Sequence, residues 1–233
     1  MQAILLCGGL GTRLRSVVSD RPKPLADIHG KPFMAYVIQQ LRKHGIDEII
    51  FAAGYKGKMV EDCFGDGSAW GFRASYAYEE EPLGTGGALR NALPYVKGEA
   101  VYVLNADTFY DIDYSGLLQL KNEKTLSMAL VTREVSDISR YGEVRTENGL
   151  VTGWNEKSSE VRSGEINGGI YLIDRTLLMR IPEGKVSLEN DLMPVWLQEG
   201  VRIGAVRNEG YFIDIGIPES YQQFQDDVAA GRI

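Results

Sequence analysis

The segment AILLCGGLGTRL, residues 3–14, begins as an apolar run, changes into a glycine-rich turn and ends on a cation followed by leucine. Such a short apolar run is typical of a strand that is buried on both faces of a parallel sheet. Gly8, Gly9 and Gly11 allow backbone conformations that other residues avoid. Successive amide groups in such a turn can form a concave phosphate site, and Arg13 adds a fixed positive charge. The segment therefore predicts a strand that leads into an anion-binding loop, with a tight strand-to-helix turn as the alternative.

Two familiar phosphate-binding motifs do not fit this turn. A dinucleotide fingerprint needs a third glycine at its sixth position, where this sequence has Leu14. A P-loop needs a lysine directly after its last glycine, but the next lysine is Lys23, which lies between two prolines. We expect the prolines to hold Lys23 in an extended backbone and to preorganise its charge for a phosphate. A solvated loop lysine is the alternative.

The composition is that of an ordinary globular protein. The chain has 233 residues, of which 44% are hydrophobic and 24% are charged, and its net charge is −7. This charge argues against general affinity for nucleic acid or an anionic membrane. Two cysteines do not make a disulfide framework. The N-terminus enters an apolar strand without a signal-peptide pattern, so we expect a cytoplasmic protein without a membrane segment, either a monomer or a small homo-oligomer.

The first half of the chain alternates strand and helix patterns. The order is strand, helix, strand, helix, strand, helix, strand, which predicts a parallel sheet with right-handed crossovers and helices on both faces. The expected strands cover residues 3–7, 48–54, 72–79 and 100–107, and the expected helices cover residues 33–45, 57–64 and 85–93.

The second half is richer in strand patterns. We expect strands at 126–135, 142–156, 167–173 and 201–206, a hairpin turn at 147–149, and helices near 174–180, 188–198 and 218–229. No linker separates the halves. The sequence therefore predicts one α/β domain over residues 1–233, with a Rossmann-like, mostly parallel sheet flanked by helices. A β-rich insertion would cover the carboxyl edge of this sheet, where open α/β sheets bind ligands.

Two aspartates each follow an apolar strand pattern. Asp107 closes VYVLNAD, and Asp214 lies in YFIDIGIP. Carboxylates at the edge of a phosphate site can hold Mg²⁺, which takes one or two carboxylates together with phosphate oxygens. A helix cap or a turn is the alternative role for each aspartate taken alone.

A second glycine-rich loop, EPLGTGG at residues 81–87, leads into a predicted helix. It can bring backbone amides and Glu81 against a base or sugar, or it can be a loop capped by Thr85. Lys157 closes a β-segment and is a candidate second phosphate contact. The small residues that follow Asn167 allow a ligand to approach closely.

The combined motifs resemble those of the sugar-1-phosphate nucleotidylyltransferases. The segments that carry the resemblance span nearly the whole chain; they are LCGGLGTRL at 6–14, PKP at 22–24, EPLGTGG at 81–87, NAD at 105–107, NEK at 155–157, NGG at 167–169 and FIDIG at 212–216. Within the family, the sequence is most similar to D-glycero-α-D-manno-heptose 1-phosphate guanylyltransferases. N-acetylmuramate 1-phosphate or hexose 1-phosphate uridylyltransferases and mannose-1-phosphate guanylyltransferases carry similar motifs.

The resemblance implies an enzyme that joins a nucleoside triphosphate, favoured as GTP, to a sugar 1-phosphate, favoured as the heptose, with release of pyrophosphate. It implies that residues 1–113 bind the nucleotide and residues 114–233 the sugar phosphate. The implied nucleotide-binding residues are Leu6, Gly8, Gly9, Gly11, Thr12, Arg13, Lys23, Glu81 and Gly86. The implied catalytic residues are Arg13, Lys23 and Asp107, and the implied Mg²⁺ ligands are Asp107 and Asp214. The implied sugar-phosphate residues are Tyr141, Gly142, Glu156, Lys157, Asn167 and Gly168.

A non-catalytic sensor and a glycosyltransferase are the two alternative functions for such a chain. A non-catalytic nucleotide-sugar sensor on the same scaffold would be expected to lose the lysine or the acids, and here they are present. A glycosyltransferase could use Asp111-Ile112-Asp113 to bind a metal, but it does not need the glycine-arginine loop.

Overall fold

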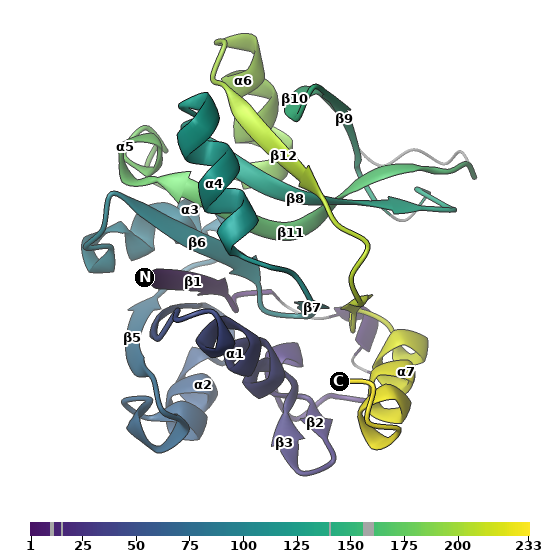
Figure 1. Ribbon diagram of the computed structural model, residues 1–233. Coiled ribbons are helices and arrows are strands. Elements are labelled where there is room, and N and C mark those ends of the chain that lie inside the picture. The colour runs from purple at the N-terminus through teal and green to yellow at the C-terminus, as the bar shows by residue number, and fades with distance from the viewer. Residues whose placement is uncertain (10–11, 15, 140, 156–160) are drawn as a thin grey trace.

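A nine-stranded sheet runs through the protein and carries helices on both of its faces (Figure 1). This computed structural model describes residues 1–9, 12–14, 16–139, 141–155 and 161–233. The strand order is β5-β4-β1-β6-β11-β8-β12-β10-β9. The predicted α/β class with a sheet between helical layers is confirmed.

The first four strands of this order are parallel, as the first half of the sequence predicts. They are β5 (Arg73–Tyr78), β4 (Glu48–Ala53), β1 (Gln2–Leu6) and β6 (Ala100–Asn105). In the register, Leu5 lies between Phe51 and Leu104. Because the strands are parallel, their carboxyl ends meet at one edge of the sheet, and the loops that follow them lie together.

The second half extends the sheet rather than covering its carboxyl edge as a separate layer. Its strands are β11 (Gly164–Asp174), β8 (Met128–Val135), β12 (Ile203–Arg207), β10 (Leu150–Asn155) and β9 (Glu143–Glu147). Antiparallel pairing of β11 with β6 satisfies the backbone of both strands and joins the halves. β8 and β12 are parallel, whereas β10 is antiparallel to both β12 and β9. The complete sheet is therefore mixed. The predicted hairpin turn is confirmed, with positive φ at Asn148 and Gly149.

The alternation of side chains along the buried strands divides the core between the two faces. Leu5, Phe51 and Leu104 belong to one apolar cluster, whereas Ile4 and Ile50 belong to the other. The first cluster packs against α1 (Phe33–Lys43), α2 (Gly57–Phe64), α4 (Ser115–Lys124) and α7 (Pro218–Ala229). The second packs against α3 (Gly84–Ala92), α5 (Arg175–Leu178) and α6 (Met193–Gln198). Strands that are apolar throughout therefore serve two cores at once.

Short elements complete the fold. The structure has a hairpin of β2 (Asp27–Ile28) and β3 (Lys31–Pro32), and an antiparallel pair of β7 (Thr108–Tyr110) and β13 (Phe212–Asp214). The segment Leu188–Leu192 forms a π-helical turn, and four 3₁₀ turns span Thr12–Leu14, Lys23–Leu25, Ser68–Trp70 and Leu93–Tyr95. Helix α4 carries no clear apolar stripe, since only Leu117 is fully buried in it, and no helix was expected there from the sequence.

We predict that Phe51→Ala lowers the free energy of unfolding by about 3–5 kcal/mol, the range for deletion of a large buried aromatic side chain. Phe51 is fully buried and stacks on Phe64 and Tyr76 with ring centroids 5.6 and 5.1 Å away. Urea denaturation measures the loss. The exposed Met179 provides the control, since Met179→Ala is expected to change stability by less than about 0.5 kcal/mol. Equal effects of the two substitutions would contradict the assigned core.

Candidate active site

A pocket of about 470 Å³ opens at the carboxyl edge of the parallel strands. Its walls come from the loops after β1, β5 and β6, from the start of α3, and from two residues of the second half of the chain. The lining residues are Leu6, Cys7, Gly8, Gly9, Lys23, Pro24, Glu79, Pro82, Gly84, Thr85, Ala88, Asn105, Asp107, Lys185 and Glu189. The glycine loop, the proline-flanked lysine and the first strand-ending aspartate therefore meet in one cavity, as predicted.

Lys23 begins a 3₁₀ turn, Lys23–Leu25, so the expected extended backbone was wrong at this residue. Pro22 is extended and caps the turn, and Pro24 fits its second position because no amide hydrogen is needed there. The turn directs the Lys23 ammonium to Asp107, with 3.2 Å between Nζ and Oδ2. The Lys23 side chain is only 13% exposed and lines the pocket.

Pairing of β7 with β13 brings Asp107 and Asp214 together from distant parts of the sequence. Thr108, the residue after Asp107, pairs with Asp214. The amide of Ile215 donates to the carbonyl oxygen of Asp107 at 3.0 Å. Asp214 therefore ends β13, while Asp107 lies in the turn between β6 and β7, directly before the strand that pairs with β13.

The electrostatics around Asp214 suit a cation. Burial, and next the negative charge of Asp107, raise the pKa of Asp214, while the Gly216 amide, Lys23 and Arg13 oppose this shift. A methyl group on Gly216 would lie 2.7 Å from Asp214 Oδ1 and 3.3 Å from Arg13 Nη2, which places the guanidinium close to the carboxylate. Two carboxylates held together in this way lose their repulsion when a divalent cation binds between them.

The described residues contain no cluster of three or more His, Cys, Asp or Glu side chains able to hold a metal. The two aspartates could therefore supply only part of a coordination sphere. Mg²⁺ is commonly held in this way, by one or two carboxylates with substrate phosphates and water. The residues present fit a metal that arrives with, or is completed by, a phosphate.

The glycine loop is shaped by close packing rather than by unusual backbone angles. Neither Gly8 nor Gly9 adopts a positive φ, in contrast to the expectation from the sequence. A methyl group on Gly54, in the loop after β4, would lie 2.9 Å from the Cα of Gly8. A side chain at Gly8 would meet Glu79 Oε1 at 3.0 Å. The backbone of the loop therefore lies against its neighbours and leaves the pocket open.

Glu79, and not Glu81, lines the pocket. Its Oε2 accepts a hydrogen bond from the Leu83 amide at 3.0 Å. Burial raises the pKa of Glu79, and this hydrogen bond partly opposes the shift. Glu81 is exposed and lies outside the lining. Gly86 is also outside it, since its amide donates to the Val186 carbonyl oxygen at 2.9 Å. The structure does not bring these two predicted base-facing residues to the cavity.

Thr85 does not cap its helix as considered from the sequence, because the helix begins at Gly84 and Leu83 is its N-cap residue. The Thr85 hydroxyl instead donates to Glu189 Oε2 at 2.5 Å and accepts from the Leu188 amide at 2.8 Å.

Part of the predicted sugar-phosphate site lies in an irregular stretch of β11. The pairing of β11 with β8 shifts between Asn167 and Tyr171. Gly169 has a φ of +73°, and a methyl group there would lie 2.8 Å from Nδ2 of Asn105, which lines the pocket. A methyl group on Gly168 would lie 2.7 Å from the Tyr110 ring. This stretch is therefore packed against the strand and turn that carry Asp107.

Tyr141 and Gly142 precede β9 and lie outside the pocket lining. Gly11, Glu156 and Lys157 lie outside the described residues, as does the side chain of Thr12. Their predicted roles stay predictions.

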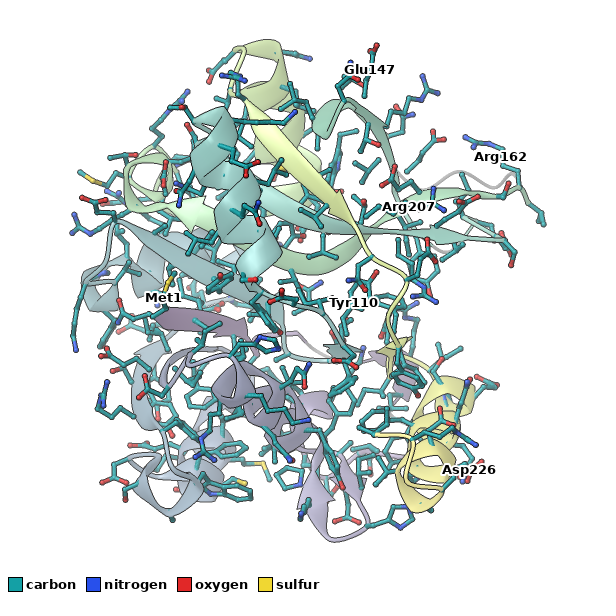
Figure 2. All side chains as sticks on the ribbon, viewed as in Figure 1. Met1, Tyr110, Glu147, Arg162, Arg207 and Asp226 are labelled. Atoms are coloured by element: carbon teal, nitrogen blue, oxygen red, sulfur yellow. The ribbon has the colours of Figure 1, made fainter. Side chains whose placement is uncertain are left out.

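Tyr110 anchors the strand pair that carries the acids, and it lies near the centre of the molecule (Figure 2). Its hydroxyl is 2.5 Å from the Asn208 carbonyl oxygen and 3.2 Å from that of Thr132. The guanidinium of Arg133 lies over the rings of Tyr110 and Phe212, at 5.9 and 5.7 Å from their centroids. These contacts tie β7 and β13 to β8 of the main sheet.

Sequence reasoning missed three charged residues of the pocket, namely Glu79, Lys185 and Glu189. Glu79 directly follows a parallel strand, which is a signal that could have found it. Lys185 and Glu189 come from a segment between α5 and α6 without a recognisable motif. Cys7 also lines the pocket, but it is buried, and burial raises the pKa of its thiol, as expected for a residue that packs in the core.

Comparison with known proteins agrees with this geometry. The sequence pattern of the nucleotidyl transferase family matches residues 2–231. The chain belongs to this family. It is 44% identical over 226 residues to the D-glycero-alpha-D-manno-heptose 1-phosphate guanylyltransferase of Campylobacter jejuni, with 96% of this chain and 98% of that protein covered. It is 37% identical to the protein of the same name from Aneurinibacillus thermoaerophilus, with 98% of each chain covered.

The fold is similar to a solved structure of HddC from Yersinia pseudotuberculosis complexed with GMP-PN. The TM-score is 0.86 at 33% identity, and the match covers 97% of this chain and 99% of that chain. The family membership expected from the motifs is thereby confirmed. In the described part of the chain, no helix is both long and apolar enough to cross a membrane.

We predict that Asp214→Asn stabilises the metal-free protein at about pH 8. The pKa of Asp214 is higher in the folded than in the unfolded chain, so its protonation favours folding. That contribution is complete below the unfolded pKa of about 4 and is lost as pH rises through the folded pKa. Urea unfolding with a chelator should therefore show a higher unfolding free energy for the variant, and the gain should shrink toward about pH 4.

Asp227→Asn is the control, because it is expected to change the free energy of unfolding in the opposite direction. Tyr211 and Arg232 lower the pKa of Asp227, so this change should destabilise the protein at the higher pH. If Asp214→Asn also destabilises the protein there, the proposed repulsion between the two acids is wrong.

Proposed function

We propose that this protein transfers the nucleoside monophosphate of GTP to D-glycero-α-D-manno-heptose 1-phosphate, giving the GDP-sugar and pyrophosphate. The observation that carries the proposal is the cluster of Lys23, Asp107 and Asp214 beside the glycine loop, because it combines a preorganised cation with two carboxylates next to a cavity of about 470 Å³. The choice of heptose and guanine is supported by the names of two relatives, each matched over 98% of its own length.

The transfer needs positioning and charge neutralisation more than acid–base chemistry. An oxygen of the sugar phosphate attacks the α-phosphorus of GTP, and the bond to the pyrophosphate oxygen breaks. The glycine loop would hold the triphosphate through its amides, and Arg13 would neutralise the leaving pyrophosphate. Lys23, which pairs with Asp107 in the protein alone, would neutralise the α-phosphate as charge builds there.

Mg²⁺ is the metal we propose for Asp107 and Asp214, and when bound it would neutralise phosphate oxygens of both substrates. The acids are preorganised for it by the pairing of β7 with β13. Burial, and next the negative charge of Asp107, raise the pKa of Asp214, and a cation between the two acids would offset both costs.

Guanine recognition is assigned to Glu79 in place of Glu81. Guanine presents N–H donors at N1 and N2, and one carboxylate can accept from both, whereas uracil offers a single donor. Glu79 lines the pocket and is half-buried, so a base that leaves it unpaired would lose a desolvated hydrogen bond. Base choice is therefore expected to be sharp.

The sugar phosphate is assigned to the second half of the chain, residues 114–233, and the nucleotide to residues 1–113. Asn167 and Gly168 would contact the sugar, since their stretch of β11 packs against Tyr110 and Asn105 beside the pocket. Tyr141, Gly142, Glu156 and Lys157 would complete this side, with Lys157 on the sugar phosphate.

A substrate matrix tests the proposal. GTP, UTP, CTP, dTTP and ATP are each combined with the heptose 1-phosphate, mannose 1-phosphate and N-acetylmuramate 1-phosphate, and pyrophosphate release is measured. GTP with the heptose should be fastest, and Glu79→Gln should reduce the preference for GTP over UTP by roughly 10-fold or more. Glu81→Gln, at an exposed position, is the matched control and should keep the preference. Faster release with UTP for every sugar would replace the guanylyl assignment by a uridylyl one.

We predict different kinetic effects for the two cations. Lys23→Ala should lower kcat by roughly 100-fold with a smaller change in KM for the nucleotide, because its charge matters most as the α-phosphate reacts. Arg13→Lys keeps the charge but loses the planar fork, and should raise KM for the nucleotide by roughly 10-fold. Steady-state kinetics separate the two. Changes confined to KM in both variants would contradict this assignment.

A further inference from the structure

Glu189 is a charged residue of the pocket wall that the mechanism above does not use. It lies in the π-helical turn Leu188–Leu192, and such turns are frequent at functional sites. Three hydroxyl groups donate to its carboxylate. Thr85 Oγ1 and Ser187 Oγ lie 2.5 and 3.2 Å from Oε2, and the Tyr171 hydroxyl lies 3.3 Å from Oε1.

The Thr85 contact joins Glu189 to the nucleotide side of the pocket. Thr85 and its neighbour Gly84 line the cavity at the start of α3. The backbone strengthens this connection, because the Val186 amide donates to the Leu83 carbonyl oxygen at 2.9 Å and the Leu188 amide donates to Thr85 Oγ1. The segment that carries Glu189 is therefore fastened to the first turn of α3.

The Tyr171 contact joins Glu189 to the sugar side. Tyr171 is fully buried in β11, and its hydroxyl accepts a hydrogen bond from Asn167 Nδ2 at 2.5 Å. Asn167 Oδ1 in turn accepts from the Gly169 amide at 3.0 Å, within the irregular stretch of β11. A chain of hydrogen bonds thus runs from the proposed sugar-binding stretch through Tyr171 to Glu189.

The direction of these bonds depends on a carboxylate at Glu189. A carboxylate only accepts, so the threonine and tyrosine hydroxyls both donate to it and keep their oxygens for Leu188 and Asn167. A glutamine at position 189 would turn its NH₂ group toward the hydroxyl of either Thr85 or Tyr171. The proton of that hydroxyl would then lose its acceptor. Placing a charge in the pocket wall is costly, and a purely structural connection between α3 and β11 would not require it.

We propose that Glu189 is a positioning residue that couples the nucleotide half of the site to the sugar-phosphate half, so that a change on either wall alters binding of the substrate on the other. The inference rests on the proposed nucleotidyl transfer, but it holds for whichever base and sugar the enzyme uses. It predicts that a change at Thr85, on the nucleotide side, affects binding of the sugar 1-phosphate, and that a change at Tyr171, on the sugar side, affects binding of the nucleotide. Contacts with the nearer substrate alone would not produce these effects.

The test uses the substrate pair that gives the fastest pyrophosphate release by the unaltered protein. KM for each substrate is measured for Thr85→Val, Tyr171→Phe, Glu189→Gln and the double variant Thr85→Val/Tyr171→Phe, together with each melting temperature. Thr85→Ser, which keeps the hydroxyl, is the conservative variant. Tyr102→Phe is the matched control, because it removes another buried tyrosine hydroxyl, bonded to the Tyr114 carbonyl oxygen at 2.9 Å.

Coupling predicts that Thr85→Val raises KM for the sugar 1-phosphate, and that Tyr171→Phe raises KM for the nucleotide, each by roughly 3-fold to 10-fold. In the double variant, the fold-increase in each KM should be smaller than the product of the fold-increases in the two single variants, because both substitutions act through the Glu189 carboxylate. Glu189→Gln should change the KM values in the same way as the double variant. Thr85→Ser, which restores the hydroxyl, should reverse most of the rise in KM for the sugar 1-phosphate that Thr85→Val causes, and Tyr102→Phe should leave both KM values near those of the unaltered protein.

The inference is overturned if each single substitution changes only the KM of the near substrate, if the two effects multiply independently, or if only the melting temperatures change. These results presuppose an active unaltered protein. Absence of pyrophosphate release by that protein with every pair is a separate outcome, which refutes the proposed function and the inference with it.

Discussion

The pairing of two three-residue strands, β7 with β13, is the constraint on which the site depends. It places Asp214 beside Asp107 although the two are far apart in sequence. The burial and repulsion that raise the pKa of Asp214 would be unfavourable in a protein that bound no cation there. Tyr110, held by Arg133 and by two backbone carbonyl oxygens, fixes this pair to the main sheet. The core thus supports an arrangement that is unfavourable until a cation binds.

The remaining parts of the site follow from the parallel sheet. Strands β1, β5 and β6 end at one edge, so the glycine loop, Glu79 and Asp107 reach the same cavity. Lys23 enters from the proline-flanked turn and neutralises Asp107 in the absence of substrate. The second half of the chain continues the sheet through β11 and contributes Glu189 to the pocket wall, to which Asn167 is linked through Tyr171.

The fold and much of the site could be predicted from sequence because they depend on local patterns. Apolar runs predict the buried strands; the glycine loop, Asp107 and Asp214 each follow such a run, and Lys23 is marked by the prolines on both sides of it. Prediction failed where a choice depended on tertiary contacts. Three consecutive glutamates follow β5, and packing against Gly8 and the hydrogen bond from the Leu83 amide hold Glu79 at the pocket. Glu189 meets Thr85 across 104 residues of sequence, so no local pattern could reveal it.

Binding of Mn²⁺, followed by electron paramagnetic resonance with and without GTP, tests the central claim most directly. Two carboxylates without further ligands should bind the ion weakly, and the triphosphate should tighten binding by roughly 10-fold or more because it completes the coordination sphere. With GTP present, Mn²⁺ should bind more tightly to the protein–GTP complex than to GTP by itself. Asp107→Asn and Asp214→Asn should each remove this difference. Tight binding without nucleotide, or ternary binding that neither substitution weakens, would contradict the account of a paired-aspartate metal site.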